Sequence, residues 1–138
     1  MLAWVTATKD MKDVILWGFS LGTFPVLSTA AKYPVKGVLL QCPIASIACI
    51  FQKELHPEID FQDDHFSNLK LISKVKSRIF ITHSSGDEII PFNHAKLLFD
   101  KFVRKNGHGQ ITFIEVGKIR HNSLHRYITA DVENELQK

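Results

Sequence analysis

Cysteine is scarce in this 138-residue sequence, which holds only Cys42 and Cys49. Two cysteines cannot build a disulfide framework, and neither belongs to a Cys-x-x-Cys pair or to a cluster of histidines and cysteines with metal-ligand spacing. The sequence therefore predicts no metal and no cofactor. Because free cysteines are typical of reducing compartments, we expect a cytoplasmic protein.

Long apolar runs are scarce as well. The longest, residues 35–51, is interrupted by lysine, glycine, glutamine and proline, so no part of it reaches the roughly 20 residues that a membrane-spanning helix needs. The first residues lack the basic and apolar regions of a signal peptide. We expect no transmembrane segment, and any membrane association would come from regions outside this chain.

No block of like charge is present. The 17 Lys and Arg and the 14 Asp and Glu leave a formal charge of +3, and the densest basic stretches, residues 74–78 and 101–105, alternate with apolar residues at helical spacing. No nucleic-acid-binding motif accompanies them, so they are interpreted as solvated helix faces and no nucleic acid partner is expected. The composition is that of a globular protein, and we expect one domain over residues 1–138.

Strand-like and helix-like segments alternate along the chain. The predicted strands are residues 14–17, 35–41, 78–83 and 110–116. The predicted helices are residues 21–33, 68–77, 92–105 and a last one from about residue 123. This alternation predicts an α/β fold with a mostly parallel sheet and helices on both faces. Functional groups of such sheets gather at the carboxyl ends of the strands.

The sequence Gly18-Phe19-Ser20-Leu21-Gly22 directly follows the first predicted strand and precedes a predicted helix. A G-x-S-x-G motif in this context is typical of a nucleophile elbow, a strained strand-to-helix turn whose flanking glycines allow close packing. A serine hydroxyl becomes a strong nucleophile only when an imidazole takes its proton, and that imidazole needs a buried carboxylate beside it. The motif thus predicts a histidine and an acid at other strand ends.

Asp87 follows the third predicted strand and His121 follows the fourth. The chain order Ser, Asp, His is the one that α/β hydrolases use. Each residue also has a plain structural interpretation, because Asp87 ends a Ser-Ser-Gly-Asp turn sequence and His121 stands beside Asn122 at a helix start. His125, one helical turn later, is an alternative base.

The remaining histidines are interpreted structurally. His83, at the end of a predicted strand, is expected to be a structural histidine near the loop that carries Asp87. The others show no partner pattern and are interpreted as solvated or helix-face residues: His56, His65, His94 and His108.

Four segments resemble the serine hydrolases of the α/β-hydrolase fold, in particular the lid-poor group of α/β-hydrolase-domain-containing proteins that includes protein depalmitoylases. They are Ile15-Leu16-Trp17-Gly18-Phe19-Ser20-Leu21-Gly22-Thr23, residues 66–75, His83-Ser84-Ser85-Gly86-Asp87-Glu88-Ile89-Ile90-Pro91 with His94, and residues 117–122. The resemblance implies Ser20 as nucleophile, Asp87 as acid and His121 as base. It also implies the backbone N–H of Leu21 as one oxyanion donor.

The implied activity is cleavage of an acyl ester or thioester in a small-molecule or acyl-protein substrate, as in carboxylesterases, lipases and acyl-protein thioesterases. The chain departs from the family pattern at two places. Ser84 stands where the family usually has glycine, and Lys118-Ile119-Arg120 precede the base in place of Gly-x-Gly.

The resemblance covers the C-terminal half of that fold, so we expect a truncated domain that lacks the N-terminal strands and the second oxyanion donor. The strand over residues 14–17 would then be an exposed apolar edge, which invites a partner. Two alternative functions follow: a catalytically impaired, hydrolase-derived binding protein that uses this edge, or a serine aminopeptidase of the same fold.

Overall fold

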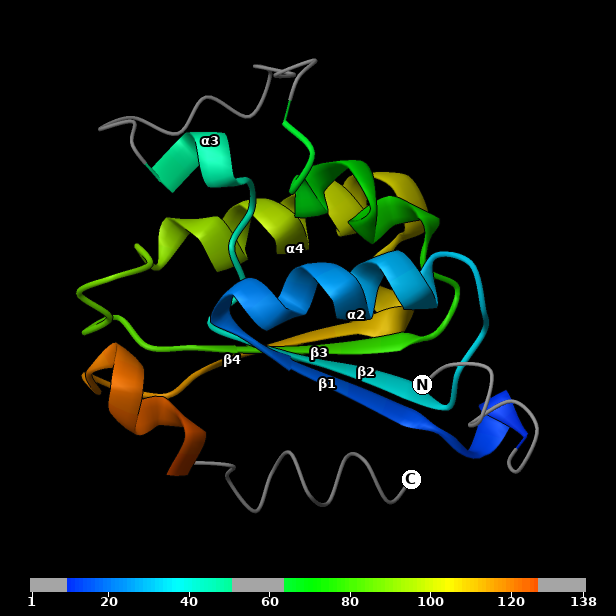
Figure 1. Ribbon diagram of the computed structural model, residues 1–138, viewed down its shortest axis with the longest axis horizontal. Helices are drawn as coiled ribbons and strands as arrows, with labels where there is room; N and C mark the ends of the chain where they lie inside the picture. The colour runs from blue at the N-terminus through cyan, green and yellow to red at the C-terminus, as the bar shows by residue number, and fades with distance from the viewer. Residues whose placement is uncertain (1–9, 51–63, 127–138) are drawn as a thin grey trace.

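The computed structural model describes residues 10–50 and 64–126, and its centre is a four-stranded sheet (Figure 1). The strands are β1 Ile15–Phe19, β2 Gly37–Gln41, β3 Arg78–His83 and β4 Ile111–Glu115. All three pairings are parallel and the strands stand in the order β1-β2-β3-β4. The predicted parallel sheet with helices is confirmed, and β3 has the predicted bounds.

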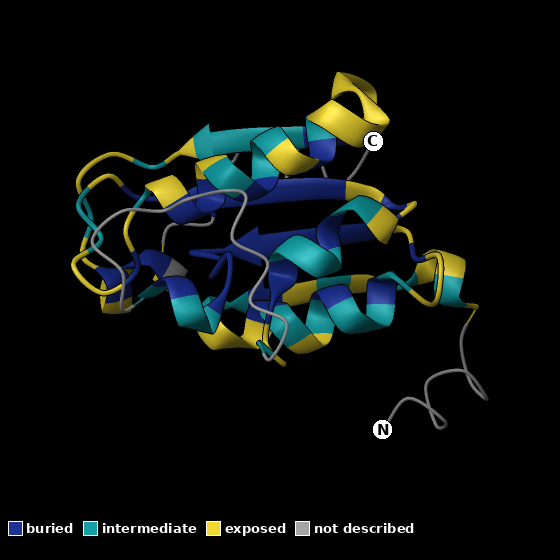
Figure 2. Cartoon of the chain, turned by 90° about the horizontal axis from the view of Figure 1, so that it is seen from above, coloured by how far each residue is buried: buried dark blue, intermediate teal, exposed yellow. Residues whose placement is uncertain are grey.

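The register places apolar side chains in rows across both faces of the sheet. Leu16 pairs with Val38 and Val38 with Ile79, and Val38 and Ile79 belong to the main core. Leu39 and Phe80, one residue further along, form a second cluster on the other face, because successive side chains of a strand point to opposite faces. The central strands β2 and β3 are therefore apolar along their middle residues and buried except at Arg78 (Figure 2).

Two longer helices, α2 Thr23–Ala30 and α4 Asn93–Asn106, lie on the same side of the sheet (Figure 1). They contribute Leu27, Leu98 and Phe102 to the main core. A single turn, α3 Ile47–Ile50, follows β2. None of the described helices is long and apolar enough to cross a membrane.

The remaining helical segments are 3-10 helices: η1 Met11–Asp13, η2 Ser20–Gly22, η3 Asn68–Lys70, η4 Ile72–Lys74, η5 His108–Gln110 and η6 His121–Arg126. Of these, η6 lies on the side of the sheet opposite α2 and α4 (Figure 1). Its Leu124 carbonyl accepts a hydrogen bond from Gln41 Nε2 at 2.8 Å. Gln41 pairs with Phe19, and its side chain shares a face of the sheet with that of Leu39.

The helix predicted over residues 68–77 is wrong, since η3 and η4 occupy this segment with Leu71 between them. Its hydrogen bonds join residues three apart, as from Leu71 N to Asn68 O at 3.1 Å and from Lys74 N to Leu71 O at 2.9 Å. The segment is tied to the loop after β2 by Leu69 N, which donates to Ala45 O at 3.0 Å. We attribute the short turns to this tertiary contact, which periodicity cannot show.

Other helix bounds shift by a few residues. The helix predicted over residues 21–33 starts as η2, continues as α2 and ends at Ala30. The last helix starts at His121 rather than at residue 123, and its predicted continuation lies outside the described residues.

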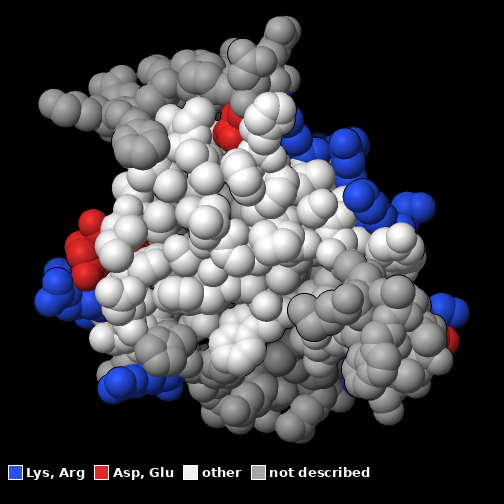
Figure 3. Space-filling view, in the orientation of Figure 1, with Lys and Arg blue, Asp and Glu red and all other residues white. Residues whose placement is uncertain are grey.

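Charged side chains lie mainly around the margin of the face in Figure 3, with basic groups gathered at the upper right and acidic groups beside basic ones at the left, and the described surface at the centre of this face is uncharged.

In the sheet formed by the described residues, β1 is an edge strand, and two of its side chains are largely exposed, Ile15 at 39% and Trp17 at 50%. Natural proteins usually protect such edges with lysine, proline or a bulge, and β1 reads Ile-Leu-Trp-Gly-Phe.

We expect the 138-residue chain to self-associate through this edge, and Ile15→Lys to weaken association about tenfold, because a charge replaces roughly 1.5 kcal/mol of apolar burial. Sedimentation velocity across a concentration series measures the effect. Tyr33→Lys is the matched control, since Tyr33 is also exposed but lies beyond the end of α2. Equal association of the wild type and Ile15→Lys would exclude the edge as the contact.

Candidate active site

Ser20 is the first residue of η2, at the sharp turn that directly follows β1, and has a backbone φ of 53°. This left-handed conformation is costly for a residue other than glycine and marks a strained turn. A Cβ on Gly18 would lie 2.7 Å from the Gly22 oxygen and 2.8 Å from the Thr23 Cα, so glycine is required there. At Gly22 a Cβ would meet nothing within 4 Å, so only the first glycine provides packing room.

A buried network fixes the backbone of the elbow. Thr23 Oγ1 donates to Ser20 O at 2.6 Å, and Asn68 Nδ2 donates to Thr23 Oγ1 at 3.0 Å and to Ile44 O at 2.7 Å. The elbow, the loop after β2 and η3 are thereby joined. The sequence carries no local signal for this network, since Asn68 and Thr23 are distant along the chain and meet only in the fold.

His121, the first residue of η6, connects two of the predicted site residues. Its Nε2 lies 3.0 Å from Ser20 Oγ and its Nδ1 lies 2.6 Å from Asp87 Oδ2. The residue is 3% exposed, and the centroid of its ring lies 4.9 Å from that of Phe19. The fold thus brings Ser20, His121 and Asp87 into one hydrogen-bonded path, while the side chain of His125, the alternative base, lies outside the described residues.

Asp87 receives several donors although its side chain is fully buried. Its Oδ1 accepts the N–H groups of Ile89 at 2.9 Å and Ile90 at 2.8 Å, so it also makes the local turn that its sequence context predicts. Burial alone would raise the pKa of Asp87. Hydrogen bonds from His83, His121, Ile90 and Ile89 outweigh burial and hold that pKa well below its usual range, so the carboxylate is ionised at neutral pH.

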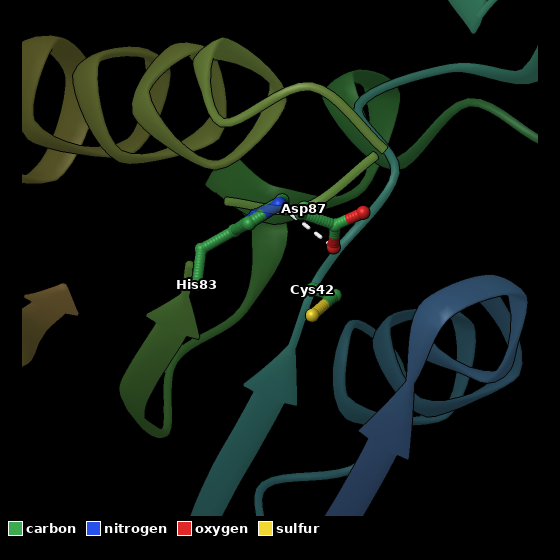
Figure 4. A group of neighbouring side chains, drawn as sticks. All are labelled: Cys42, His83 and Asp87. Carbon is green, nitrogen blue, oxygen red and sulfur yellow. Dashed lines mark ion pairs between the residues drawn. The ribbon is translucent and has the colours of Figure 1, made fainter. Parts of the chain in front are cut away.

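Cys42 and His83 lie beside Asp87 at the ends of β2 and β3 (Figure 4). His83 Nε2 lies 2.9 Å from the Ile90 oxygen and 3.4 Å from Asp87 Oδ2, in agreement with the structural role expected for it. The ligand atoms of the three side chains lie within 4.8 Å of one another, but burial, then the neighbouring Asp87, raise the pKa of the Cys42 thiol. A metal needs the thiolate, so we interpret the cluster as hydrogen bonding around Asp87.

The structure corrects the expectation for His94. It was expected to be solvated or on a helix face, but it is 1% exposed and its Nδ1 accepts from Ala45 N at 3.1 Å. The first turn of α4 lies against the loop after β2, and the resulting burial, together with the nearby His83, lowers the pKa of His94 to about 4. His65 and His108 are exposed, as expected, and His56 lies outside the described residues.

Gln41 anchors η6 to the sheet. Its Nε2 donates to Leu124 O at 2.8 Å, and its Oε1 accepts from Trp17 Nε1 at 3.3 Å. Leu124 itself is fully buried. The helix that begins with His121 is therefore held at the same end of the sheet as Ser20.

Leu21 follows Ser20 in the first turn of η2, and its side chain is 51% exposed. The first N–H groups of a helix have no partner within that helix. The Leu21 N–H is one of these groups, and Leu21 directly follows Ser20 in the chain.

No protein-family model matches the chain. The chain is 34% identical over 93 residues to "Alpha/beta hydrolase domain-containing protein 17B" of Homo sapiens, a match that covers 67% of this chain and 32% of the relative. It is 30% identical over 93 residues to protein 17C of Mus musculus, covering 67% of this chain and 28% of that one. The matched segment spans about a third of these relatives.

Solved structures share the fold at low sequence identity. The esterase domain of a Rhodothermus marinus protein has a TM-score of 0.64 at 17% identity, covering 86% of this chain and 56% of that one. A Mycobacterium tuberculosis puromycin-hydrolyzing peptidase reaches 0.71 at 13% identity, covering 98% and 23%. Pyrococcus horikoshii acylaminoacyl peptidase gives 0.69 at 15% identity, covering 91% and 23%. Sequence and structural relatives agree on the same architecture, and the chain has the α/β-hydrolase fold.

Proposed function

We propose that the protein is a serine hydrolase that cleaves an acyl ester or thioester, with Ser20 as nucleophile, His121 as base and Asp87 as acid. One observation carries the proposal: a continuous path runs from Ser20 Oγ to His121 Nε2 at 3.0 Å and from His121 Nδ1 to Asp87 Oδ2 at 2.6 Å. Both distances lie within the reach that proton transfer requires. The three residues come from three different strand ends, so no local sequence preference accounts for their meeting.

The proposed reaction has two halves. Ser20 Oγ attacks the acyl carbonyl while His121 Nε2 takes its proton, and the ionised Asp87 stabilises the imidazolium that forms. His121 then donates the proton to the departing alcohol or thiol, which leaves an acyl-enzyme on Ser20. Water, activated by His121, attacks this ester and releases the acid.

Leu21 N–H would stabilise the negative oxygen of the tetrahedral intermediate. One such donor accounts for about 10²- to 10³-fold in rate. In α/β hydrolases a second oxyanion donor comes from a loop that follows an earlier strand. The proposed site therefore includes a donor from a part of the fold that lies outside the segment matched in the relatives.

An apolar surface beside the elbow supports an acyl substrate. Leu21 and Phe66 are 51% and 48% exposed, and the Phe66 ring lies 5.0 Å from that of Phe24 on α2. Exposed apolar groups next to a nucleophile fit a substrate whose reacting group carries hydrocarbon. We propose a small-molecule or acyl-protein substrate of this kind, and a cytoplasmic location, which the free and buried Cys42 and Cys49 support.

Two other functions have support. The peptidases among the structural relatives favour amide cleavage at the same site. The exposed edge of β1 favours a binding protein derived from a hydrolase, whose own turnover is impaired. Robust ester turnover by the 138-residue chain would exclude this binding-only function.

Ser20→Ala is expected to abolish labelling by a fluorophosphonate probe, because the probe phosphonylates an activated serine hydroxyl. Mass spectrometry of the labelled peptide identifies the site. Ser28→Ala, on α2, is the matched control and should label as the wild type does. Labelling that survives in Ser20→Ala would rule out Ser20 as the nucleophile.

The stability difference between the wild type and Asp87→Asn should shrink by about 1.5 kcal/mol as pH falls from 5 to 2.5. The depressed pKa of Asp87 stabilises the fold above the unfolded pKa of about 4, and this stabilisation is lost as pH falls toward the folded pKa. Urea unfolding at each pH measures it, and the burial of His94, the largest cause of its lowered pKa, is common to both proteins. A difference that stays constant with pH would contradict the ionised, hydrogen-bonded carboxylate.

Matched p-nitrophenyl ester and p-nitroanilide substrates with one acyl group distinguish ester from amide cleavage. We expect the ratio of kcat/KM for the ester to kcat/KM for the anilide to exceed the ratio of their uncatalysed hydrolysis rates in buffer by at least about 10³-fold. A factor of 10³ corresponds to about 4 kcal/mol of selective transition-state stabilisation. Equal acceleration of both would favour the peptidase function.

A further inference from the structure

Two loops meet beside His121: the acid loop, residues 84–88, and the base loop, residues 116–120, which leads from β4 to His121. Ser84 opens the acid loop directly after β3 and is fully buried. Its Oγ donates to Gly117 O at 2.6 Å and accepts from Gly86 N at 3.0 Å and Ile119 N at 2.7 Å. One hydroxyl thus bonds its own loop once and the base loop twice.

Glu88, at the other end of the acid loop, makes a second connection. Its Oε2 accepts the backbone N–H of His121 at 3.0 Å, and its Oε1 accepts Arg120 Nε at 3.1 Å. The pKa of Glu88 is lowered by the His121 N–H bond and, to a smaller extent, by Arg120, so this carboxylate is ionised at neutral pH. Glu88 therefore holds the backbone of the same residue whose ring contacts Asp87.

Between these connections the two loops touch at their backbones. A Cβ on Gly86 would lie 2.9 Å from the carbonyl carbon of Lys118 and 3.0 Å from its Cα, so no side chain fits there. Gly117 adopts a φ of 60°, a left-handed conformation that glycine adopts without strain. The base loop is consequently bonded at Gly117, Ile119 and Arg120 by residues of the loop that carries Asp87.

We propose that Ser84 and Glu88 are positioning residues that set the His121 imidazole on Asp87, the hydroxyl through the base loop and the carboxylate through the His121 backbone. This inference rests on the proposed function of His121 as base. Asp87 and its two positioning neighbours share one loop, so the distance from His121 Nδ1 to Asp87 Oδ2 is set within a single rigid unit. A departure of about 1 Å in such a geometry can cost about 10²-fold in rate.

This arrangement also explains both departures from the family pattern. The serine at position 84 supplies the hydroxyl that bonds a base loop containing Lys118, Ile119 and Arg120. Arg120 points to solvent at 82% exposure and pairs with Glu88. The bulk of the base loop is thus accommodated outside the site.

The test compares Ser84→Ala and Glu88→Ala with two controls in the full chain. Ser85→Ala is the matched serine control, because Ser85 is exposed and its Oγ lies 3.5 Å from the same Gly117 oxygen. Glu88→Gln is the conservative variant, since it retains an acceptor for the His121 N–H. The first readout is the downfield NMR resonance of the His121 Nδ1 proton, which reports the bond to Asp87 whether or not Ser20 reacts. The second is the pH profile of fluorophosphonate labelling.

We expect Ser84→Ala and Glu88→Ala to weaken or shift the Nδ1 resonance and to lower the labelling rate about tenfold or more with an altered pH midpoint. Ser85→Ala should match the wild type, and Glu88→Gln should show a smaller effect than Glu88→Ala. An unchanged resonance and pH midpoint in a folded Ser84→Ala or Glu88→Ala protein overturns the proposal, as does the lack of a downfield resonance in the wild type.

Two results have separate meanings. If Ser84→Ala does not fold, Glu88→Ala decides, because the Glu88 side chain is partly exposed, so its truncation opens no buried cavity and removes only the acceptor of the His121 N–H and of Arg120. If the wild type gives the resonance but no labelling, the proposed function fails for this chain, and the resonance in the variants still decides the positioning role.

Discussion

Parallel pairing in unbroken order is the constraint on which the rest of this structure depends. Phe19, Gln41 and Thr82 stand opposite one another across β1, β2 and β3, so the residue that follows each of them lies at the same carboxyl end of the sheet. Those residues are Ser20, Cys42 and His83, and the first two have φ angles of 53° and 47°. The sheet alone therefore gathers a hydroxyl, a thiol and an imidazole, and it aims the following loops at one another.

Burial then gives the site its electrostatic character. An isolated carboxylate would be unstable in the position of Asp87, but His83, His121 and two backbone N–H groups compensate its charge. His94, in the first turn of α4, is kept neutral at neutral pH because burial lowers its pKa. Among the described residues, Asp87 is thus a buried carboxylate whose charge is compensated by donors from its own loop and from His83 and His121.

The sequence predicted the features whose cause is local. The apolar run of β3, the elbow motif and the strand-end positions of Asp87 and His121 could all be recognised from adjacent residues. It could not predict contacts between segments distant along the chain: the hydrogen bond of η3 to the loop after β2, the hydrogen bond of Ala45 N to His94, or the partners of Ser84. These depend on backbone atoms whose positions exist only in the folded chain, so residue type carries no record of them.

The contact at Gly86 limits which changes of loop length are compatible with the site. Because the acid loop and the base loop touch there without room for a side chain, an insertion in either would displace both Asp87 and His121. The elbow, anchored separately through Thr23 and Asn68, would remain in place. The placement of the acid and the base therefore depends on the lengths of both loops together, whereas the placement of the nucleophile depends on a separate set of contacts.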